Sequence, residues 1–224
     1  MLFLDTADKA QIGALYRAGL ISGVTTNPTI LCRAGIQHRY HKDWCEQVCD
    51  VIQPTPLSYE VTSDDLCNML TEAQTIADWG DNMVVKVPIH GILRKGVLGN
   101  IGVISDLERT YNIRVNVTAM MTAQQCYLAA LAGATYVSLF GGRVADMGGN
   151  VEQEIKRFIE LRDRESLKAK LIVGSVRDAI NVIDWLVAGA DIVTVPPQYF
   201  TKMVWHPYTA ETVQQFLRDA ANVQ

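Results

Sequence analysis

The sequence lacks an apolar run long enough to cross a membrane, for which about 18 consecutive apolar residues are needed. Its apolar start is interrupted by Asp5 and Asp8, whereas a secretory signal needs an unbroken apolar stretch after basic residues. We therefore expect a cytoplasmic protein with no membrane partner.

An excess of basic charge is also missing. The 224 residues include 20 Lys and Arg against 24 Asp and Glu, for a formal net charge of -4. Proteins that neutralise the phosphates of nucleic acids normally carry a basic excess, so we expect no nucleic acid partner. A chain with 49% hydrophobic and 20% charged residues has the composition of a globular domain, which argues against disorder.

Cysteine patterns for disulfides or zinc are absent, because the five cysteines form an odd set without a CxxC pair. Cys45 and Cys49 lie one helical turn apart and could share a metal, but buried packing is the favoured interpretation. The four histidines form no HExxH motif, and no GxGxxG or GxxxxGK[ST] motif occurs. We therefore expect neither a metal nor a nucleotide cofactor.

What the sequence does contain is an alternation of short apolar runs with longer segments of helical periodicity, such as residues 151–164. Small turns with Ala-Gly, at Gly19, Gly133 and Gly189, precede several of the runs. The eight runs, which we predict to be strands, cover residues 2–5, 23–27, 57–61, 83–88, 114–120, 136–140, 170–176 and 191–196.

Eight such units predict one α/β domain over residues 1–224, built as a (β/α)8 TIM barrel. A doubly wound open sheet is the alternative, because periodicity does not show closure. In a barrel the chemistry lies at the carboxyl ends of the strands. Polar residues end most of the runs: Asp5, Thr25, Thr26, Asn27, Glu60, Lys86, Asn116, Thr118, Ser138, Ser175 and Arg177.

Lys86 is the candidate nucleophile, because it lies within an otherwise apolar run. Burial disfavours the charged form of a lysine, and the neutral amine is the form that attacks a carbonyl to give a Schiff base. Asp5 and Glu60 end two earlier runs and supply the acid and base that imine chemistry requires. The alternative is a structural ion pair of Lys86 with one of them, and Asp5 could also begin a helix.

Arg143, Ser175 and Arg177 follow the sixth and seventh runs, next to the place where barrels commonly bind phosphate. Guanidinium groups and a hydroxyl suit a phosphomonoester. Arg177 could instead simply begin a solvated helix. The amides of Asn27 and Asn116 suit sugar hydroxyls, although Asn27 precedes a proline as in an ordinary turn.

Three motifs, at residues 4–7 (LDTA), 23–30 (GVTTNPTI) and 84–88 (VVKVP), resemble signatures of the transaldolase family, in particular its short members, which include fructose-6-phosphate aldolases. The resemblance implies a barrel of class I aldolase type that forms a Schiff base at Lys86 without a cofactor and acts on sugar phosphates. It also implies that Asp5 transfers protons and that Glu60 and Thr118 hold the catalytic water. The implied substrate-binding residues are Thr26, Asn27, Asn116, Ser138, Phe140, Arg143, Ser175 and Arg177.

Two residues bear on which member of the family the chain resembles. Transaldolases carry Glu at the position of Glu60 and Phe at that of Phe140, where the fructose-6-phosphate aldolases carry Gln and Tyr. The resemblance therefore favours transfer of a dihydroxyacetone unit from a ketose such as fructose 6-phosphate or sedoheptulose 7-phosphate to an aldose phosphate. The alternatives are an aldolase that releases dihydroxyacetone, and a non-catalytic phosphosugar-binding barrel.

The last segment, residues 197–224, contains more apolar side chains than a final barrel helix needs, and we expect them to be exposed, among them Tyr199, Phe200, Trp205 and Tyr208. We expect the segment to be helical and to contact a neighbouring subunit. Short members of the family form rings of subunits through this segment, so the resemblance implies a homo-oligomer, pentameric or decameric.

Overall fold

The computed structural model describes residues 1–92 and 98–222. Eight strands form its central sheet: β1 (Leu2–Asp5), β2 (Val24–Thr25), β3 (Leu57–Glu60), β4 (Met83–Pro88), β5 (Val115–Met120), β6 (Tyr136–Leu139), β7 (Lys170–Val173) and β8 (Ile192–Val195). The helices are α1 (Lys9–Arg17), α2 (Pro28–Arg33), α3 (His41–Ile52), α4 (Leu66–Ala77), α5 (Ile101–Arg109), α6 (Ala123–Leu131), α7 (Gly141–Asp146), α8 (Val151–Arg164), α9 (Ala179–Val187), α10 (Pro197–Val204) and α11 (Pro207–Asn222), with a short 3-10 helix η1 at His38–Tyr40.

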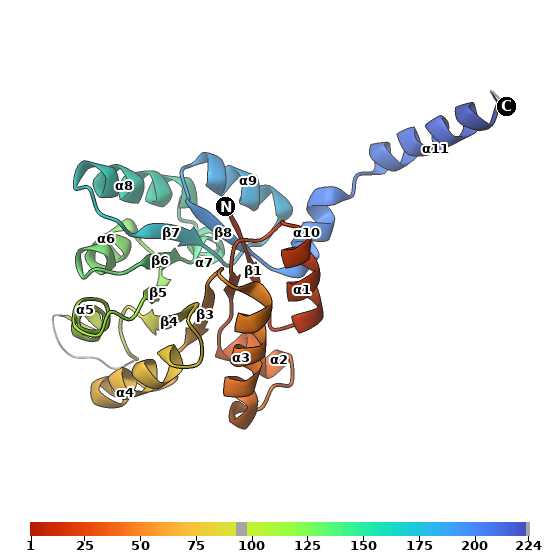
Figure 1. Cartoon of the computed structure of the whole chain (residues 1–224). Helices are drawn as coiled ribbons and strands as arrows, with labels where there is room; N and C mark the ends of the chain where they lie inside the picture. Colours follow the sequence, from red (N-terminus) through yellow and green to blue (C-terminus); the bar gives the residue numbers. More distant parts are fainter. Residues whose placement is uncertain (93–97, 223–224) are drawn as a thin grey trace.

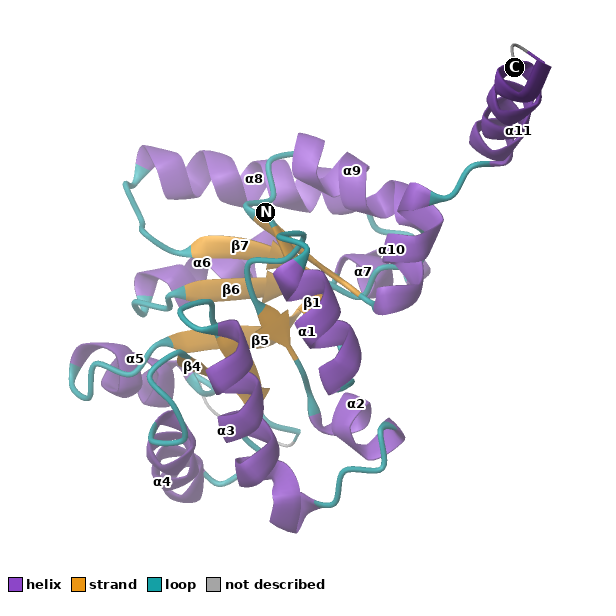
Figure 2. Cartoon of the chain, turned by 45° about the vertical axis from the view of Figure 1, so that its right-hand side comes forward, coloured by secondary structure: helices purple, strands orange, loops and turns teal. Residues whose placement is uncertain are grey.

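The strands are all parallel and follow one another around a closed barrel, in which β8 pairs with β1 through Leu2 and Val193. The (β/α)8 prediction is confirmed, and the open sheet is wrong. Figure 1 shows the helices arranged around the strands, and Figure 2 shows the same layers coloured by structure. Among the described residues, no helix combines the length and apolar character needed to span a bilayer.

Two strands end at least two residues earlier than predicted, each for a local reason. β2 ends at Thr25 because Asn27 caps α2, its Oδ1 accepting from Ile30 N at 2.9 Å. β7 ends at Val173 because the backbone turns at Ser175, which has a φ of +64°. Asp5 ends β1, and Asp8 rather than Asp5 caps the first helix. Both early ends place polar side chains at the mouth of the barrel.

The inside of the barrel is apolar at the amino-terminal ends of the strands and polar toward their carboxyl ends. Alternation along each strand places residues two apart on the same face. A small cluster, separate from the core between strands and helices, fills the lower layer; its members are Phe3, Val84, Tyr136, Ile172 and Ile192. Two residues further along these strands come Asp5, Lys86, Ser138, Gly174 and Thr194. The polar layer therefore lies on a hydrophobic floor.

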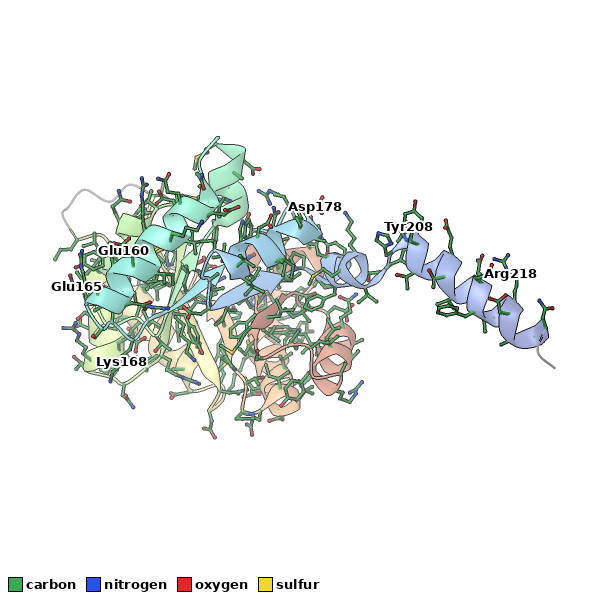
Figure 3. All side chains as sticks on the ribbon, turned by 90° about the horizontal axis from the view of Figure 1, so that it is seen from above. Glu160, Glu165, Lys168, Asp178, Tyr208 and Arg218 are labelled. Carbon is green, nitrogen blue, oxygen red and sulfur yellow. The ribbon has the colours of Figure 1, made fainter. Side chains whose placement is uncertain are left out.

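The C-terminal segment is helical, as predicted, but only part of it belongs to the barrel. Phe200 is buried, which corrects the expectation that it is exposed, and Tyr199 is half-buried. Trp205 and Tyr208 are 65% and 71% exposed. Figures 1 and 3 show α11 projecting away from the rest of the molecule, with Tyr208 and Arg218 along it.

Candidate active site

A cavity of about 670 Å³ opens at the carboxyl ends of the strands. All the predicted site residues line it except Thr26 and Asn116, each of which accepts a hydrogen bond from a residue that does. The predicted residues that line it are Asp5, Thr25, Asn27, Glu60, Lys86, Thr118, Ser138, Phe140, Arg143, Ser175 and Arg177. Residues from the first strand to the loop after the seventh are thus brought to one place by closure of the barrel.

Lys86 is 5% exposed and lies between the register partners Glu60 on β3 and Asn116 on β5. Its Nζ donates a hydrogen bond to the carbonyl oxygen of Thr26 at 2.8 Å and lies 3.4 Å from Glu60 Oε2. The ion pair that the sequence suggested as an alternative is therefore present, inside the cavity. An amine held this way has a carboxylate beside it and space above it for a carbonyl compound.

Asp5 lies on β1, at the same level of the barrel. Burial raises the pKa of its carboxyl group, while the charge of Lys86 and a hydrogen bond from Thr25 act to lower this pKa, and Glu60 acts to raise it. Thr25 Oγ1 donates to Asp5 Oδ1 at 2.7 Å and lies 2.6 Å from Thr194 Oγ1. Thr194 was not among the predicted residues, and its only signal is that it interrupts an apolar strand.

Asn116 supports the cavity from below. Its Nδ2 donates to Ser58 Oγ at 3.2 Å, and its Oδ1 accepts from Ser138 Oγ at 2.7 Å. Ser138 lines the cavity, whereas Asn116 is fully buried. Asn116 therefore fixes the hydroxyl of Ser138. Ser58 was not predicted, although it precedes Glu60 by two residues and so shares its face of the strand.

The hydroxyl of Thr118 is buried and has no hydrogen-bond partner among the residues that the structure describes. It lines the cavity two residues beyond Asn116, on the strand next to that of Lys86. A buried hydroxyl needs a partner, and a water or a substrate oxygen in the cavity would supply one.

Asn27 and Thr26 contribute through different groups. Asn27 precedes a proline, which suggested an ordinary turn, but its Oδ1 caps α2. Nδ2 of the same side chain can donate to a ligand in the cavity that it lines. Thr26 acts through its backbone carbonyl, which holds Lys86.

A cationic rim borders the cavity. The guanidinium of Arg143 lies over the ring of Phe140, 5.1 Å from its centroid. Arg177 pairs with Asp146, at 2.6 Å from Oδ2, and this contact lowers the pKa of the Asp146 carboxyl group. Asp178, beside Arg177, is the residue that caps α9. Arg33 on α2 also lines the cavity and was not predicted.

Close packing brings α7 to this rim. A Cβ atom built on Gly142 would lie 1.7 Å from the carbonyl oxygen of Ser175. Glycine therefore allows α7 to approach the loop after β7. Arg143 and Ser175, which could hold an anion together, both depend on this approach.

The thiols that could have shared a metal are packed in the core. Cys45 and Cys49 are buried on α3, and burial raises the pKa of the Cys49 thiol to about 12. His41, one turn earlier, has both ring nitrogens in hydrogen bonds, to Tyr59 Oη and to the Ile36 carbonyl. Within residues 1–92 and 98–222, no group of three or more His, Cys, Asp or Glu side chains is arranged to hold a metal ion.

A second, larger groove of about 1140 Å³ runs from the cavity between α1, α2, α3 and the start of α10. It shares Asp5, Arg33 and Gln198 with the cavity, so the two are continuous. The mouth of the barrel is thus open toward α1 and α3.

A known protein is similar to this chain over almost its whole length. The chain is 37% identical over 222 residues to a probable transaldolase of Streptococcus pyogenes serotype M5 (strain Manfredo), a match that covers 98% of this chain and 97% of the relative. Two solved structures share the fold at low identity. A thiamine phosphate pyrophosphorylase from Pyrococcus furiosus has a TM-score of 0.59 at 12% identity, covering 87% of this chain and 84% of that one. A mandelate oxidase variant has a TM-score of 0.57 at 14% identity, and the match spans 88% of this chain and 64% of the oxidase.

The sequence profile of one family covers almost the whole chain. Residues 2–224 match the family described as Transaldolase/Fructose-6-phosphate aldolase. The polar layer of the barrel lies within the matched region, and so do the motifs at residues 4–7, 23–30 and 84–88. The chain therefore belongs to the transaldolase/fructose-6-phosphate aldolase family.

Proposed function

We propose that the protein is a transaldolase, which transfers a dihydroxyacetone unit from a phosphorylated ketose to an aldose phosphate through a Schiff base on Lys86. One observation carries the proposal: the buried amine of Lys86 faces the cavity beside Glu60, with Asp5 on the same layer of the barrel. An amine and two carboxylates suffice for imine formation and for the proton transfers of aldol cleavage.

In the proposed reaction, the Lys86 ammonium gives a proton to Glu60, and the neutral amine adds to the ketose carbonyl carbon. Glu60 then returns this proton, through a water, to the carbinolamine hydroxyl, which leaves as water and gives the protonated imine. Asp5 accepts the proton of the C4 hydroxyl as the C3–C4 bond breaks, and the bonding electrons pass into the imine to form an enamine. The first aldose leaves. The enamine carbon then attacks the carbonyl of the acceptor aldose, whose oxygen takes the proton back from Asp5. Water held by Glu60 and Thr118 finally hydrolyses the new imine and frees Lys86.

The remaining residues bind the sugar in this proposal. Asn27 donates a hydrogen bond to a hydroxyl of the donor, and Ser138, whose own proton goes to Asn116, accepts one. Arg143, Ser175 and Arg177 bind the phosphate at the rim, where two guanidinium groups complement its charge. The length of the cavity between Lys86 and the rim then selects phosphorylated sugars over free ones.

Phe140 and Glu60 favour transfer over release of dihydroxyacetone. The side chain of Phe140 has no hydroxyl to hold a water near the enamine, so the enamine persists until an acceptor aldehyde binds. The second candidate is aldol cleavage of the fructose-6-phosphate aldolase type, which uses the same imine but releases the ketone. The third is a phosphosugar-binding barrel in which Lys86 only pairs with Glu60.

One experiment separates these candidates. The protein is incubated with fructose 6-phosphate and borohydride, and the modified peptide is identified by mass spectrometry, with parallel assays in the presence and absence of erythrose 4-phosphate. We expect an adduct on Lys86 and turnover only with the acceptor. An adduct with release of dihydroxyacetone in the absence of acceptor would identify the aldolase, and no adduct with any ketose phosphate would leave the binding barrel.

We also propose that the active form is a homo-oligomer in which α11 packs on a second copy of the chain. Every described residue of α11 is exposed, and Val213, Phe216 and Leu217 are 48%, 66% and 67% exposed on one side of it. A 16-residue helix without packing is only marginally stable in water. An apolar stripe on such a helix therefore calls for a partner, and an oligomer supplies one to each copy.

A further inference from the structure

Three side chains from neighbouring strands form a chain of hydrogen bonds inside the barrel. β1 lies between β8 and β2, so Asp5 is flanked by strands that carry Thr194 and Thr25. Thr25 Oγ1 lies 2.7 Å from Asp5 Oδ1 and 2.6 Å from Thr194 Oγ1. Both threonines are buried, at 2% and 7% exposure. Water is thus largely excluded from these bonds.

The hydrogen bonds from Thr194 through Thr25 to Asp5 have one direction when Asp5 is ionised. A carboxylate only accepts hydrogen bonds, and each hydroxyl has a single proton to donate. Thr25 therefore gives its proton to Asp5 Oδ1, and it must accept from Thr194. Gly174 leaves room for this arrangement, because a Cβ atom there would lie 3.0 Å from Thr194 Cγ2.

We propose that Thr25 and Thr194 are positioning residues for proton transfer at Asp5: they hold Oδ1, so that Oδ2 is the oxygen that exchanges the proton with the substrate. This inference rests on the proposed function, because it needs Asp5 to act as the base. Thr25 fixes the rotation of the carboxylate, and Thr194 fixes the direction of the Thr25 hydroxyl. Neither threonine takes part in forming the imine.

The charges around Asp5 set the expected effect on pH dependence. Lys86 on β4 and Glu60 on β3 are the charged groups that shift the Asp5 pKa, Arg33 on α2 lines the same cavity, and the flanking strands β2 and β8 present Thr25 and Thr194. The hydrogen bond from Thr25 acts to lower the pKa that burial raises. Without this bond the pKa rises further. Asp5 must be ionised to accept a proton. As the pH is lowered, activity is therefore lost at a higher pH than in the wild type.

The test compares Thr25→Val with Thr25→Ser in the full chain, by measuring kcat and KM for transfer from fructose 6-phosphate to erythrose 4-phosphate as a function of pH. We expect Thr25→Val to lower kcat about tenfold or more and to move the acidic limb of the profile up by about one pH unit, as loss of a hydrogen bond to an ionised group implies. Thr25→Ser keeps the hydroxyl and should keep the position of the limb.

Thr194→Val provides the second arm and covers the case in which Thr25→Val does not fold. It should shift the limb in the same direction by a smaller amount, and Thr194→Ser should restore it. Combining Thr194→Val with Thr25→Val should add no further shift, because loss of the Thr25 hydroxyl already removes both hydrogen bonds. An unshifted limb in the folded valine variants would overturn the proposal and leave a structural role.

Trapping with borohydride distinguishes this failure from failure of the proposed function. Imine formation depends on Lys86, so fructose 6-phosphate should still give the Lys86 adduct in Thr25→Val. An adduct in the wild type with no shift in the variants would refute only the role of the threonines. No adduct in the wild type would refute the proposed function itself.

Discussion

Two properties of Lys86, its charge and its nucleophilic amine, can be separated by substitution. Its Nζ pairs with Glu60 and donates to the Thr26 carbonyl. The ion pair needs the charge, whereas the Schiff base needs the amine. We expect Lys86→Met to lower transfer by several orders of magnitude, because the covalent route is lost. Lys86→Arg should be equally inactive, since a guanidinium keeps the charge but forms no imine.

The measurement is the initial rate of transfer, with circular dichroism to show that each variant is folded. Substantial activity of Lys86→Arg would mean that charge beside Glu60 is what matters, and the Schiff base would have to be abandoned. Removing the amine also leaves Glu60 unpaired, but this carboxylate is 17% exposed and water can reach it. We therefore expect only a small loss of stability.

Phe140 is the residue at which the two activities of the family should be separable. Its ring lies beneath Arg143 at the edge of the cavity. Phe140→Tyr adds a hydroxyl that can hold a water next to the enamine, and we expect release of dihydroxyacetone relative to transfer to rise about tenfold. Phe140→Leu is the control, because it removes the ring without adding a donor. Equal product ratios in the two variants would show that the hydroxyl is not responsible.

Arg177 is oriented before any substrate binds. Asp146 accepts from its guanidinium, and the hydroxyl of Tyr199 donates to its backbone carbonyl. Arg177→Ala should raise the KM for fructose 6-phosphate about tenfold, as expected for one charged hydrogen bond, with a smaller fall in kcat. Arg164→Ala, which removes another exposed arginine on α8, should leave both constants unchanged. A fall in kcat at constant KM would remove Arg177 from the phosphate site.

Among the structural elements, α7 lies close to the loop after β7 because Gly142 has no side chain. A Cβ atom on Gly142 would overlap the carbonyl oxygen of Ser175, whose own φ of +64° is already unfavourable for a residue with a side chain. We expect Gly142→Ala to lower the free energy of unfolding by about 1–3 kcal/mol through overpacking. It should also raise the KM for phosphorylated substrates, because Arg143 and Ser175 move apart.

Urea unfolding and steady-state kinetics test this expectation. Gly102→Ala on α5 is the matched control, because its Cβ atom would meet nothing within 4 Å. Alanine is the better helix former, so this variant should be unchanged or stabilised by about 0.5–1 kcal/mol. If Gly142→Ala has the same unfolding free energy and KM as Gly102→Ala, the close approach of α7 to the loop after β7 does not position the cationic rim.

Element boundaries show which features the sequence can predict. β4 and α8 have their predicted bounds, because an apolar run and a charged amphipathic segment are each bounded by clear turn residues. β2 is shorter than its apolar and β-branched run, because a cap at Asn27 overrides the propensity of Thr26 for extended structure. Local patterns predict that an element exists, whereas hydrogen bonds to the next element decide where it ends.

The faces of the strands were harder to predict than the strands themselves. In a closed barrel both faces of a strand are buried, so the alternation of polar and apolar residues that distinguishes inside from outside is largely lost. Polar residues at strand ends were predicted, and so were Lys86 and Asn116 within their strands, but Ser58 and Thr194 were missed. Thr194 meets Thr25 across 169 positions in the chain, a contact that requires the barrel to close.

On the scale of the whole molecule, the chain divides into a barrel that packs on itself and a final helix that does not. The polar layer and the cationic rim lie in the barrel, while Figures 1 and 3 show α11 standing away from it. Tyr208, Phe216 and Leu217 are exposed by 66% or more. The same side chains, packed on a second copy, would remove this apolar surface from water.

Removal of residues 207–224 should therefore change the assembly more than the barrel. We expect the shortened chain to form an assembly of fewer subunits than the full chain, as measured by light scattering. Phe216→Asp, which keeps the length of the chain but places a charge on the apolar stripe, should weaken assembly in the same direction. Gln215→Ala is a matched control on the same helix, because it removes an exposed polar side chain, and it should leave the subunit number unchanged.

Activity of these variants then shows what assembly contributes to catalysis. The barrel of this chain supplies Lys86 together with Asp5 and Glu60, so a shortened chain should still form the Lys86 adduct with fructose 6-phosphate and borohydride. A change in KM without loss of the adduct would mean that the partner shapes the mouth of the cavity rather than its chemistry. If the full chain and the shortened chain had the same subunit number, α11 would have no part in assembly and the proposed oligomer would need another interface.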